Sequence, residues 1–188
     1  EDWEEIHFKG ASVDKLARAG IEMGILKKSE VENKTYEFYK QPPLDELAKL
    51  NAQLHWFSYY KKWVPQENFY YATEHTGFKA NPERSEGTYS KYASLDDKTD
   101  GFHWYLSYIK FGMGRASRDA QQDIRRHHIT REEGVALVQR YDGEFPKNHF
   151  KWFLNYLDIT EEQFWDVCNF YRSLSNVWEK NGNDWRLK

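Results

Sequence analysis

The chain has 188 residues, with 27 basic and 30 acidic side chains and a formal net charge of −3. This near-balance gives no reason to expect binding to nucleic acids or membrane surfaces, which usually requires a basic excess. The single cysteine, Cys168, excludes an internal disulfide and a multi-cysteine zinc site. Because no apolar run approaches the roughly 18 residues of a spanning helix and no signal peptide opens the chain, we expect a soluble, cytoplasmic protein.

Residues 1–53 are predicted to form an N-terminal connector with short helices. The composition favours a helix from Val13 to Lys28, and the charged segment that follows has no clear period. The pair Pro42-Pro43 then begins a second helix, from Leu44 to about Gln53. This part of the chain carries the weakest structural signals.

Residues 54–188 are predicted to form one helical domain, which opens with aromatic residues. The segment Leu54–Tyr60 is rich in aromatic side chains and is interpreted as a short strand. Pro65 begins a helix that should end at Gly77, because glycine favours the left-handed cap. Residues 82–93 are interpreted as a loop.

Two capping boxes give the firmest helix starts in the second half. Thr130 and Thr160 are each followed three residues later by Glu or Gln, so side chains and backbone amides can satisfy each other. Other helices are predicted from Leu95 to Phe111, starting near Asp96, and from Ala116 to His127.

The remaining signals complete a mainly α fold of six to seven helices. Phe150 to Leu157 carries the apolar spacing of a short helix. Near the C-terminus, Asn181-Gly182 is typical of a β-hairpin turn between two tryptophan-bearing flanks.

Acidic residues recur at helical spacing near Asp96. Asp96 or Asp97, Asp100 and His103 would share one face of a helix, and such carboxylates suit Mg²⁺ when phosphate oxygens complete its shell. The alternative is an ordinary helix start, where acidic side chains meet the positive end of the helix dipole. The string also resembles the aspartate-rich motif of prenyl-diphosphate enzymes, but a second such motif is missing.

A glycine pair separates two of the predicted helices. Gly112 and Gly114 are flanked by Lys110 and Arg115, so a helix break would expose backbone amides beside two cations. A phosphorylated ligand would fit there. The alternative is a simple corner between two helices, in which the glycines only relieve crowding.

Several strings occur in a fixed order along the chain: Trp63-x-Pro65-Gln66-Glu67-Asn68, Pro82-Glu83-Arg84-x-Glu86-Gly87-Thr88-Tyr89, Tyr92-Ala93-Ser94-Leu95-Asp96-Asp97-Lys98-x-Asp100-Gly101-Phe102-His103, Lys110-Phe111-Gly112-x-Gly114-Arg115-Ala116, Ile129-Thr130-Arg131-Glu132-Glu133 and Tyr141-Asp142-Gly143-Glu144-Phe145-Pro146. Together they resemble the C-terminal region of the N-acetyl sugar amidotransferases of bacterial surface-polysaccharide (LPS O-antigen) biosynthesis.

The resemblance implies the C-terminal half of a PP-loop ATP pyrophosphatase-type enzyme. Such an enzyme converts the acetamido group of a nucleotide-linked sugar to an acetamidino group, with ATP and Mg²⁺, and with ammonia from glutaminase and synthase-like subunits. The Ser-Gly-Gly-x-Asp-Ser loop that binds ATP in this family is missing from the sequence. We therefore expect ATP to bind to an N-terminal half, and this chain alone to be inactive.

The resemblance also implies roles for individual residues. We expect Asp96 and Asp97 to be catalytic and to hold Mg²⁺ together with Asp100, and one cleft to contain both acids and the heads of Lys110 and Arg115. The expected substrate-binding residues are Lys110, Arg115, Glu86, Tyr89 and His103. The alternative function is a docking module for the ammonia-producing subunits. Because an incomplete enzyme leaves uncovered the surface that its missing half would cover, apolar area should remain exposed among Trp56, Phe57, Tyr59, Tyr60 and Trp63.

Overall fold

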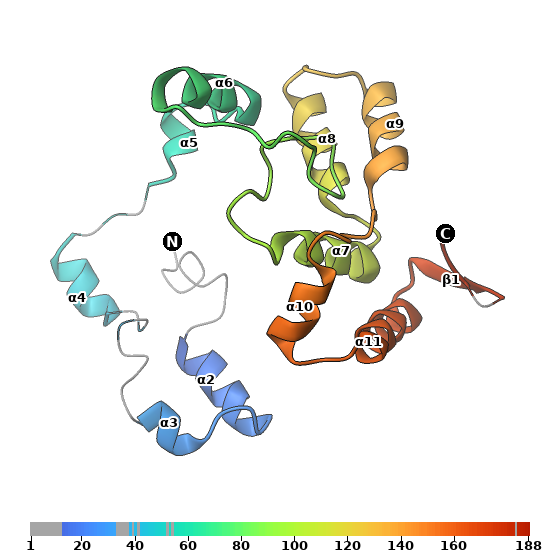
Figure 1. The fold of residues 1–188 in the computed structure, drawn as a ribbon. Helices are drawn as coiled ribbons and strands as arrows, with labels where there is room; N and C mark the ends of the chain where they lie inside the picture. The colour runs from blue at the N-terminus through green and yellow to red at the C-terminus, as the bar shows by residue number, and fades with distance from the viewer. Residues whose placement is uncertain are drawn as a thin grey trace. The chain divides into compact units, whose positions relative to one another are not determined.

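The computed structural model is mainly helical and ends in a two-stranded antiparallel sheet, which confirms the predicted fold class (Figure 1). It divides into two compact units, residues 1–62 and 63–188. In the part of the chain that the structure describes, no helix is long and apolar enough to cross a membrane. The described residues are 13–32, 38, 40, 42–51, 53, 55–182 and 184–188.

The first unit contains only short helices among its described residues. The predicted helix from Val13 to Lys28 ends early, at Glu22, because the chain turns at Gly24 with a left-handed φ of +72°. The helices are α2 (Val13–Glu22), α3 (Lys28–Glu32), α4 (Leu44–Lys49) and α5 (Phe57–Tyr60).

The strand predicted at Leu54–Tyr60 is wrong over its described residues. Phe57–Tyr60 forms the single helical turn α5, closed by a 3.0 Å bond from the Lys61 N–H to the Phe57 carbonyl. A lone helical turn satisfies part of its own backbone, whereas a strand needs a partner. Leu54 itself lies outside the described residues. As expected, aromatic side chains here stay exposed, by 57 to 86%, at Trp56, Phe57, Tyr59, Tyr60 and Trp63.

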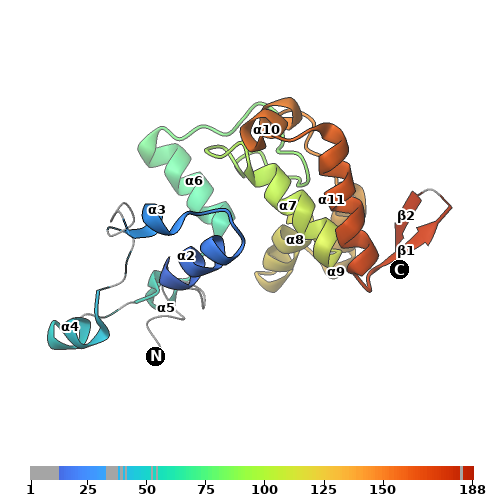
Figure 2. The ribbon, with the colours of Figure 1, turned by 90° about the horizontal axis from the view of Figure 1, so that it is seen from below.

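The second unit consists of six described helices and a C-terminal hairpin. Helices α8 and α9 lie side by side as an antiparallel pair, and α7 packs against α11 (Figures 1 and 2). The elements are α6 (Pro65–Thr76), α7 (Asp100–Phe111), α8 (Arg115–Arg125), α9 (Arg131–Tyr141), α10 (Phe150–Leu157), α11 (Glu161–Leu174), β1 (Trp178–Asn181) and β2 (Asp184–Leu187).

Both predicted capping boxes are confirmed. The Thr130 hydroxyl accepts the Glu133 N–H at 3.2 Å, and the Glu133 carboxylate accepts the Thr130 N–H at 2.7 Å. Thr160 and Gln163 repeat this exchange at 3.2 and 2.8 Å. Helix α6 also begins at Pro65 and ends before Gly77, whose φ is +71°.

Helix α7 begins later than its apolar stripe predicts, at Asp100 instead of near Asp96. Ser94 adopts a left-handed φ of +56°, which no helix continues. The Asp97 carboxylate then accepts both the N–H and the hydroxyl of Thr99 at 2.7 Å. Such local side-chain bonds offer the backbone an alternative to the helix.

The core of the second unit is an aromatic cluster between α7, α10, α11 and the hairpin. The rings of Phe102 and Phe153 stack at 3.9 Å, and the indole N–H of Trp178 donates to the Ile109 carbonyl at 2.6 Å. The buried members are Phe102, Tyr105, Ile109, Phe153, Phe164, Cys168 and Trp178. Burial raises the pKa of the Cys168 thiol to about 11, so this cysteine is a core residue and not a nucleophile.

The C-terminal hairpin is confirmed with a shifted turn. Asn181 pairs with Asp184 across the strands, so it belongs to β1. Gly182 therefore follows the strand as the first turn residue, with a left-handed φ of +62°.

We expect Thr130→Ala and Thr160→Ala each to destabilise the protein by about 0.5–2 kcal/mol, because each loses one side of a capping box. Urea unfolding measures the change. Thr73→Ala is the matched control, since its hydroxyl bonds only to the Phe69 carbonyl inside α6. Loss of stability at Thr73 equal to that at the two caps would contradict the capping interpretation.

Candidate functional site

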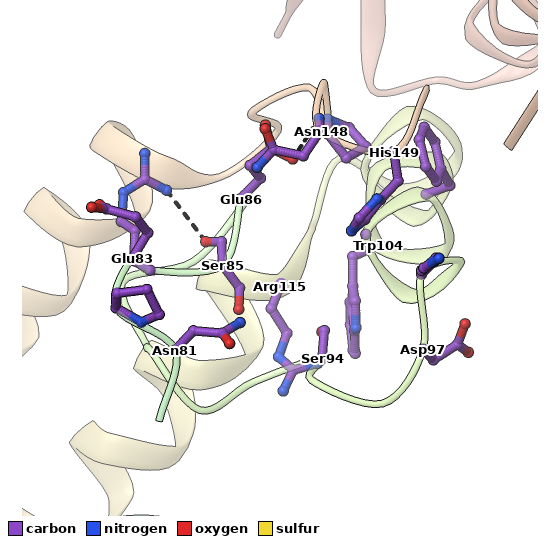
Figure 3. Close-up of a pocket in the computed structure, with 16 residues that line it drawn as sticks. Asn81, Glu83, Ser85, Glu86, Ser94, Asp97, Trp104, Arg115, Asn148 and His149 are labelled. Atoms are coloured by element: carbon purple, nitrogen blue, oxygen red, sulfur yellow. Dashed lines mark hydrogen bonds between the residues drawn. The ribbon is translucent and has the colours of Figure 1, made fainter. Parts of the chain in front are cut away.

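A surface pocket of about 310 Å³ brings together segments that lie far apart in the sequence (Figure 3). Its walls come from residues 81–86, from the start of α7, from Arg115 at the start of α8 and from residues 146–149. All of these belong to the second unit.

The loop that forms one wall is fixed by an ion pair. Arg84 donates two hydrogen bonds to the two carboxylate oxygens of Glu144, at 2.6 and 2.7 Å. The same carboxylate accepts the Gly87 N–H at 2.8 Å, and the Arg84 guanidinium lies 4.6 Å from the centre of the Tyr141 ring. Bidentate pairs of this kind fix geometry as well as charge.

The hydrogen bonds from Arg84 lower the pKa of Glu144, and the carboxylate of Glu144 raises that of Arg84. Both groups are therefore charged throughout the neutral range. Each side chain is about one-third exposed, so solvent weakens the pair.

A second acidic residue joins the same loop to the opposite wall. Glu86 accepts the backbone N–H groups of Lys147 and Asn148 at 3.0 and 3.2 Å. Gly87 in turn accepts the N–H of Ala116, in α8, at 3.0 Å. Glu86 was expected to bind substrate. It does line the pocket, but its hydrogen bonds connect two loops of the protein.

The predicted anion site at the glycine break is filled by the protein itself. Gly114 precedes α8, and its N–H donates to the Asp142 carboxylate at 2.9 Å. The N–H and hydroxyl of Ser117 donate to the same carboxylate at 3.2 and 2.6 Å. The amides that were expected to meet a phosphate therefore already have an internal anion.

Arg115 lies at the centre of the pocket wall and is paired twice. It donates to both oxygens of Asp119, at 3.1 and 3.2 Å, and to Asp100 at 3.2 Å. Its guanidinium also stacks 5.1 Å from the centre of the Trp104 ring. Only 17% of the side chain is exposed. Arg115 therefore holds neighbouring side chains of the pocket wall in place, and little of its charge is available to a ligand.

The three acids expected to hold Mg²⁺ do not converge. The hydroxyl and backbone N–H of Thr99 occupy Asp97 and lower its pKa. Asp100 binds Arg115 and the hydroxyl of Ser94, and Asp96 is exposed and does not line the pocket. Among the described residues, no three acidic, histidine or cysteine side chains form a metal-binding group. Asp96, Asp97 and Asp100 therefore do not form a site that fits Mg²⁺.

The expected common cleft contains Asp97 and Arg115 but not Lys110. The Lys110 ammonium lies over the rings of Phe111 and Tyr171, 5.2 and 5.7 Å from their centres. It sits at the far end of α7, so the single-cleft prediction is wrong for this residue.

Two further predicted substrate residues also lie outside the pocket. His103 is exposed, and its ring packs edge-on against Trp104 at 5.3 Å. The Tyr89 hydroxyl donates to Asp123 at 2.7 Å, and burial raises its pKa. Neither side chain faces the space that Asp97 and Arg115 line.

Residues 86–188 match the family described as "LPS biosynthesis protein WbpG-like, C-terminal domain". The chain belongs to this family. Its place in LPS biosynthesis follows from that membership, and the pocket walls from Glu86 to His149 fall within the matched region. Among the curated proteins, no relative of the chain is found.

In this WbpG-like domain, several residues that build the pocket were not predicted from the sequence. Asp142 and Glu144 stand in one of the resembling strings, but without a role assigned to either. Trp104 lines the pocket, and its indole N–H is buried without a hydrogen-bond partner in the described part of the chain. Asn148 and His149 also line the pocket (Figure 3).

We expect Glu144→Gln to destabilise the domain by about 1–2 kcal/mol at neutral pH, since Arg84 loses a charged acceptor that is partly screened by water. The wild-type pKa of Glu144 is lowered on folding from 4.5, so its stabilisation is complete above that value. It is lost as the pH falls through the folded-state pKa. The variant should therefore lose less stability than wild type on acidification below about pH 4.5.

Urea unfolding at a series of pH values from about 7 to about 3 measures this difference. Glu132→Gln, at an exposed position in α9, is the matched control and should follow the wild-type profile. Parallel acid profiles for wild type and Glu144→Gln would contradict the assignment.

Proposed function

We propose that this chain is the sugar-binding half of an ATP-dependent amidotransferase in LPS biosynthesis. Its substrate would be a nucleotide-linked N-acetyl sugar, whose acetamido group becomes an acetamidino group. ATP would bind to an N-terminal half, and ammonia would come from glutaminase and synthase-like subunits. Family membership and the resembling strings support this proposal.

The observation that carries the proposal is the pocket built from those strings. Three resembling strings supply Arg84, Asp97 and Arg115 to its wall, and a fourth supplies Glu144 to hold the loop. A volume of about 310 Å³ is at the small end of ligand pockets, which span about 300–1,000 Å³. That size suits one sugar ring.

The charges of the lining favour a neutral polar ligand over a diphosphate. Three carboxylates and three cations line the pocket: Glu83, Glu86, Asp97, Arg84, Lys98 and Arg115. Arg84 and Arg115 already bind internal carboxylates. The balance leaves no excess of positive charge for two phosphate groups, so we place the sugar in this pocket and not the diphosphate.

Two lining residues are suited to act on the acetamido group. The unpaired indole N–H of Trp104 would turn toward a ligand oxygen, because a buried donor without a partner is unfavourable. His149 has ring nitrogens that can act as a general base, and it would take a proton from the attacking ammonia. Adenylation by ATP supplies the leaving group; ammonia then forms the new C–N bond, the C–O bond breaks, and AMP leaves.

The reaction is tested by combining this chain with the ATP-binding half. We expect pyrophosphate release that depends on the N-acetyl sugar nucleotide, and none from either half alone. Trp104→Phe keeps the ring but removes the N–H, so KM should rise about five- to tenfold, the effect of one hydrogen bond.

Trp152→Phe is the matched control, because Trp152 is exposed on α10 and does not line the pocket. Sugar-dependent pyrophosphate release by this chain alone would contradict the proposal, as would an unchanged KM for Trp104→Phe.

Docking of the ammonia-channelling subunit is a second candidate function. Helix α11 exposes an apolar stripe at helical spacing, formed by Val167, Phe170, Tyr171 and Leu174. Beside it lie exposed Phe111 and the Lys110 ammonium. Exposed apolar patches of this kind mark protein interaction sites.

We expect Phe170→Glu together with Leu174→Glu to abolish co-purification of the synthase-like subunit, because the charges would enter an apolar contact. Asn169→Glu, on the polar face of α11, is the control and should leave binding intact. Equal recovery of the subunit with both proteins would exclude docking through this stripe.

A further inference from the structure

A second hollow, of about 390 Å³, lies on the other side of Arg115. It is formed by Trp63, by α6, by residues 89–93 and by one face of α8. Arg115 lines both this hollow and the first pocket, so the two spaces meet at one side chain. A single elongated ligand could reach both.

One wall of the second hollow is aromatic and held in place. Phe69 and Tyr92 stack with ring centres 4.5 Å apart and an angle of 13°, and the Tyr92 hydroxyl donates to Gln66 at 3.0 Å. The Arg126 guanidinium donates twice to the Trp63 carbonyl, at 3.1 and 2.7 Å. The Trp63 indole is 57% exposed, so a flat ring surface remains open beside a fixed backbone.

Arg118 differs from Arg84 and Arg115, the other arginines that line the two hollows, because it makes no hydrogen bond to a carboxylate in the described part of the chain. Its nearest carboxylate oxygen, on Asp119, is 3.9 Å away, and about half of its side chain is exposed. Its guanidinium lies 5.5 Å from the centre of the Trp104 ring, which lines the first pocket. Arg118 itself lines the second hollow, so it stands at the junction.

The acids near the junction already have hydrogen-bond partners. Asp119 accepts from Arg115 and from the Thr88 hydroxyl, and Asp123 accepts from Tyr89. The charge of Asp119 is therefore partly cancelled within the protein, whereas the neutral Tyr89 hydroxyl leaves the charge of Asp123 in place. A ligand anion placed at Arg118 would meet a guanidinium that is less engaged than Arg115.

We infer that the second hollow binds the nucleoside end of the nucleotide-linked substrate, with the base against Trp63 and the diphosphate at Arg118. The inference rests on the proposed function, which places the sugar in the first pocket. Bases stack on aromatic side chains through their π-faces, and guanidinium groups bind phosphate oxygens by charged hydrogen bonds. The two hollows with a cation between them match the order base, diphosphate, sugar.

Calorimetric titration of the chain with UDP tests this inference, with uridine as the arm that lacks phosphate. We expect UDP to bind about tenfold more tightly than uridine. Trp63→Ala and Arg118→Ala should each weaken UDP binding about tenfold or more. For uridine, only Trp63→Ala should matter.

The controls are an exposed aromatic residue and an arginine of the same helix as Arg118. Tyr71→Ala removes an exposed aromatic ring of α6 that does not line the hollow, and Arg125→Ala removes an arginine of α8 that bonds only to the Gln121 carbonyl. Both should bind UDP like wild type. Circular dichroism checks that every variant is folded.

Absence of UDP binding to the wild-type chain overturns the inference. So does equal UDP affinity in wild type, Trp63→Ala and Arg118→Ala. In amide NMR spectra, UDP-induced shifts confined to the first pocket would also overturn it. Sugar-dependent pyrophosphate release that remains sensitive to Trp104→Phe would, in each of these cases, leave the proposed function standing.

Discussion

A bidentate pair between the Arg84 guanidinium and the Glu144 carboxylate joins two loops that have no helix or strand of their own. The loop before α7 is long, and its closure costs conformational entropy that a local contact cannot recover. Through the Gly87 N–H, the same carboxylate also fixes the residue whose carbonyl meets the start of α8. The pocket walls therefore keep their spacing because one acidic side chain connects three segments.

Charged side chains around the pocket are largely paired with groups of the protein itself. Asp142 caps α8, and Arg115 divides its charge between Asp100 and Asp119. Charged and polar groups that the sequence suggested as ligand-binding, such as Arg115 and the Gly114 amide, are thus bound to side chains of the protein itself. Under the proposed function, preorganisation of this kind would hold a neutral ligand without repulsion and would leave the anionic part of the substrate to Arg118, a less engaged cation.

Helix positions were predictable wherever the signal was local. The threonine caps and the Pro65 start depend on residues within one turn, and the structure confirms them. The start of α7 was not predictable, because Ser94 adopts a left-handed backbone and the Asp97 carboxylate binds Thr99, which keeps the residues before Asp100 out of the helix. The pocket depends on contacts such as Arg84 with Glu144, which are 60 residues apart. No periodic pattern in the sequence indicates that Arg84 and Glu144 pair, although both residues stand in the strings that resemble the family.

Gly143 separates the two carboxylates on which this arrangement depends. Its φ is +73°, and a Cβ atom there would lie 2.2 Å from the Tyr108 ring. Asp142 on one side turns toward α8, and Glu144 on the other turns toward Arg84. A single residue without a side chain thus lets the acids on either side of it contact two different parts of the molecule. A backbone change at Gly143 would therefore disturb two contacts at once, that of Asp142 with the start of α8 and that of Glu144 with Arg84. Neither contact could be altered independently by varying this turn.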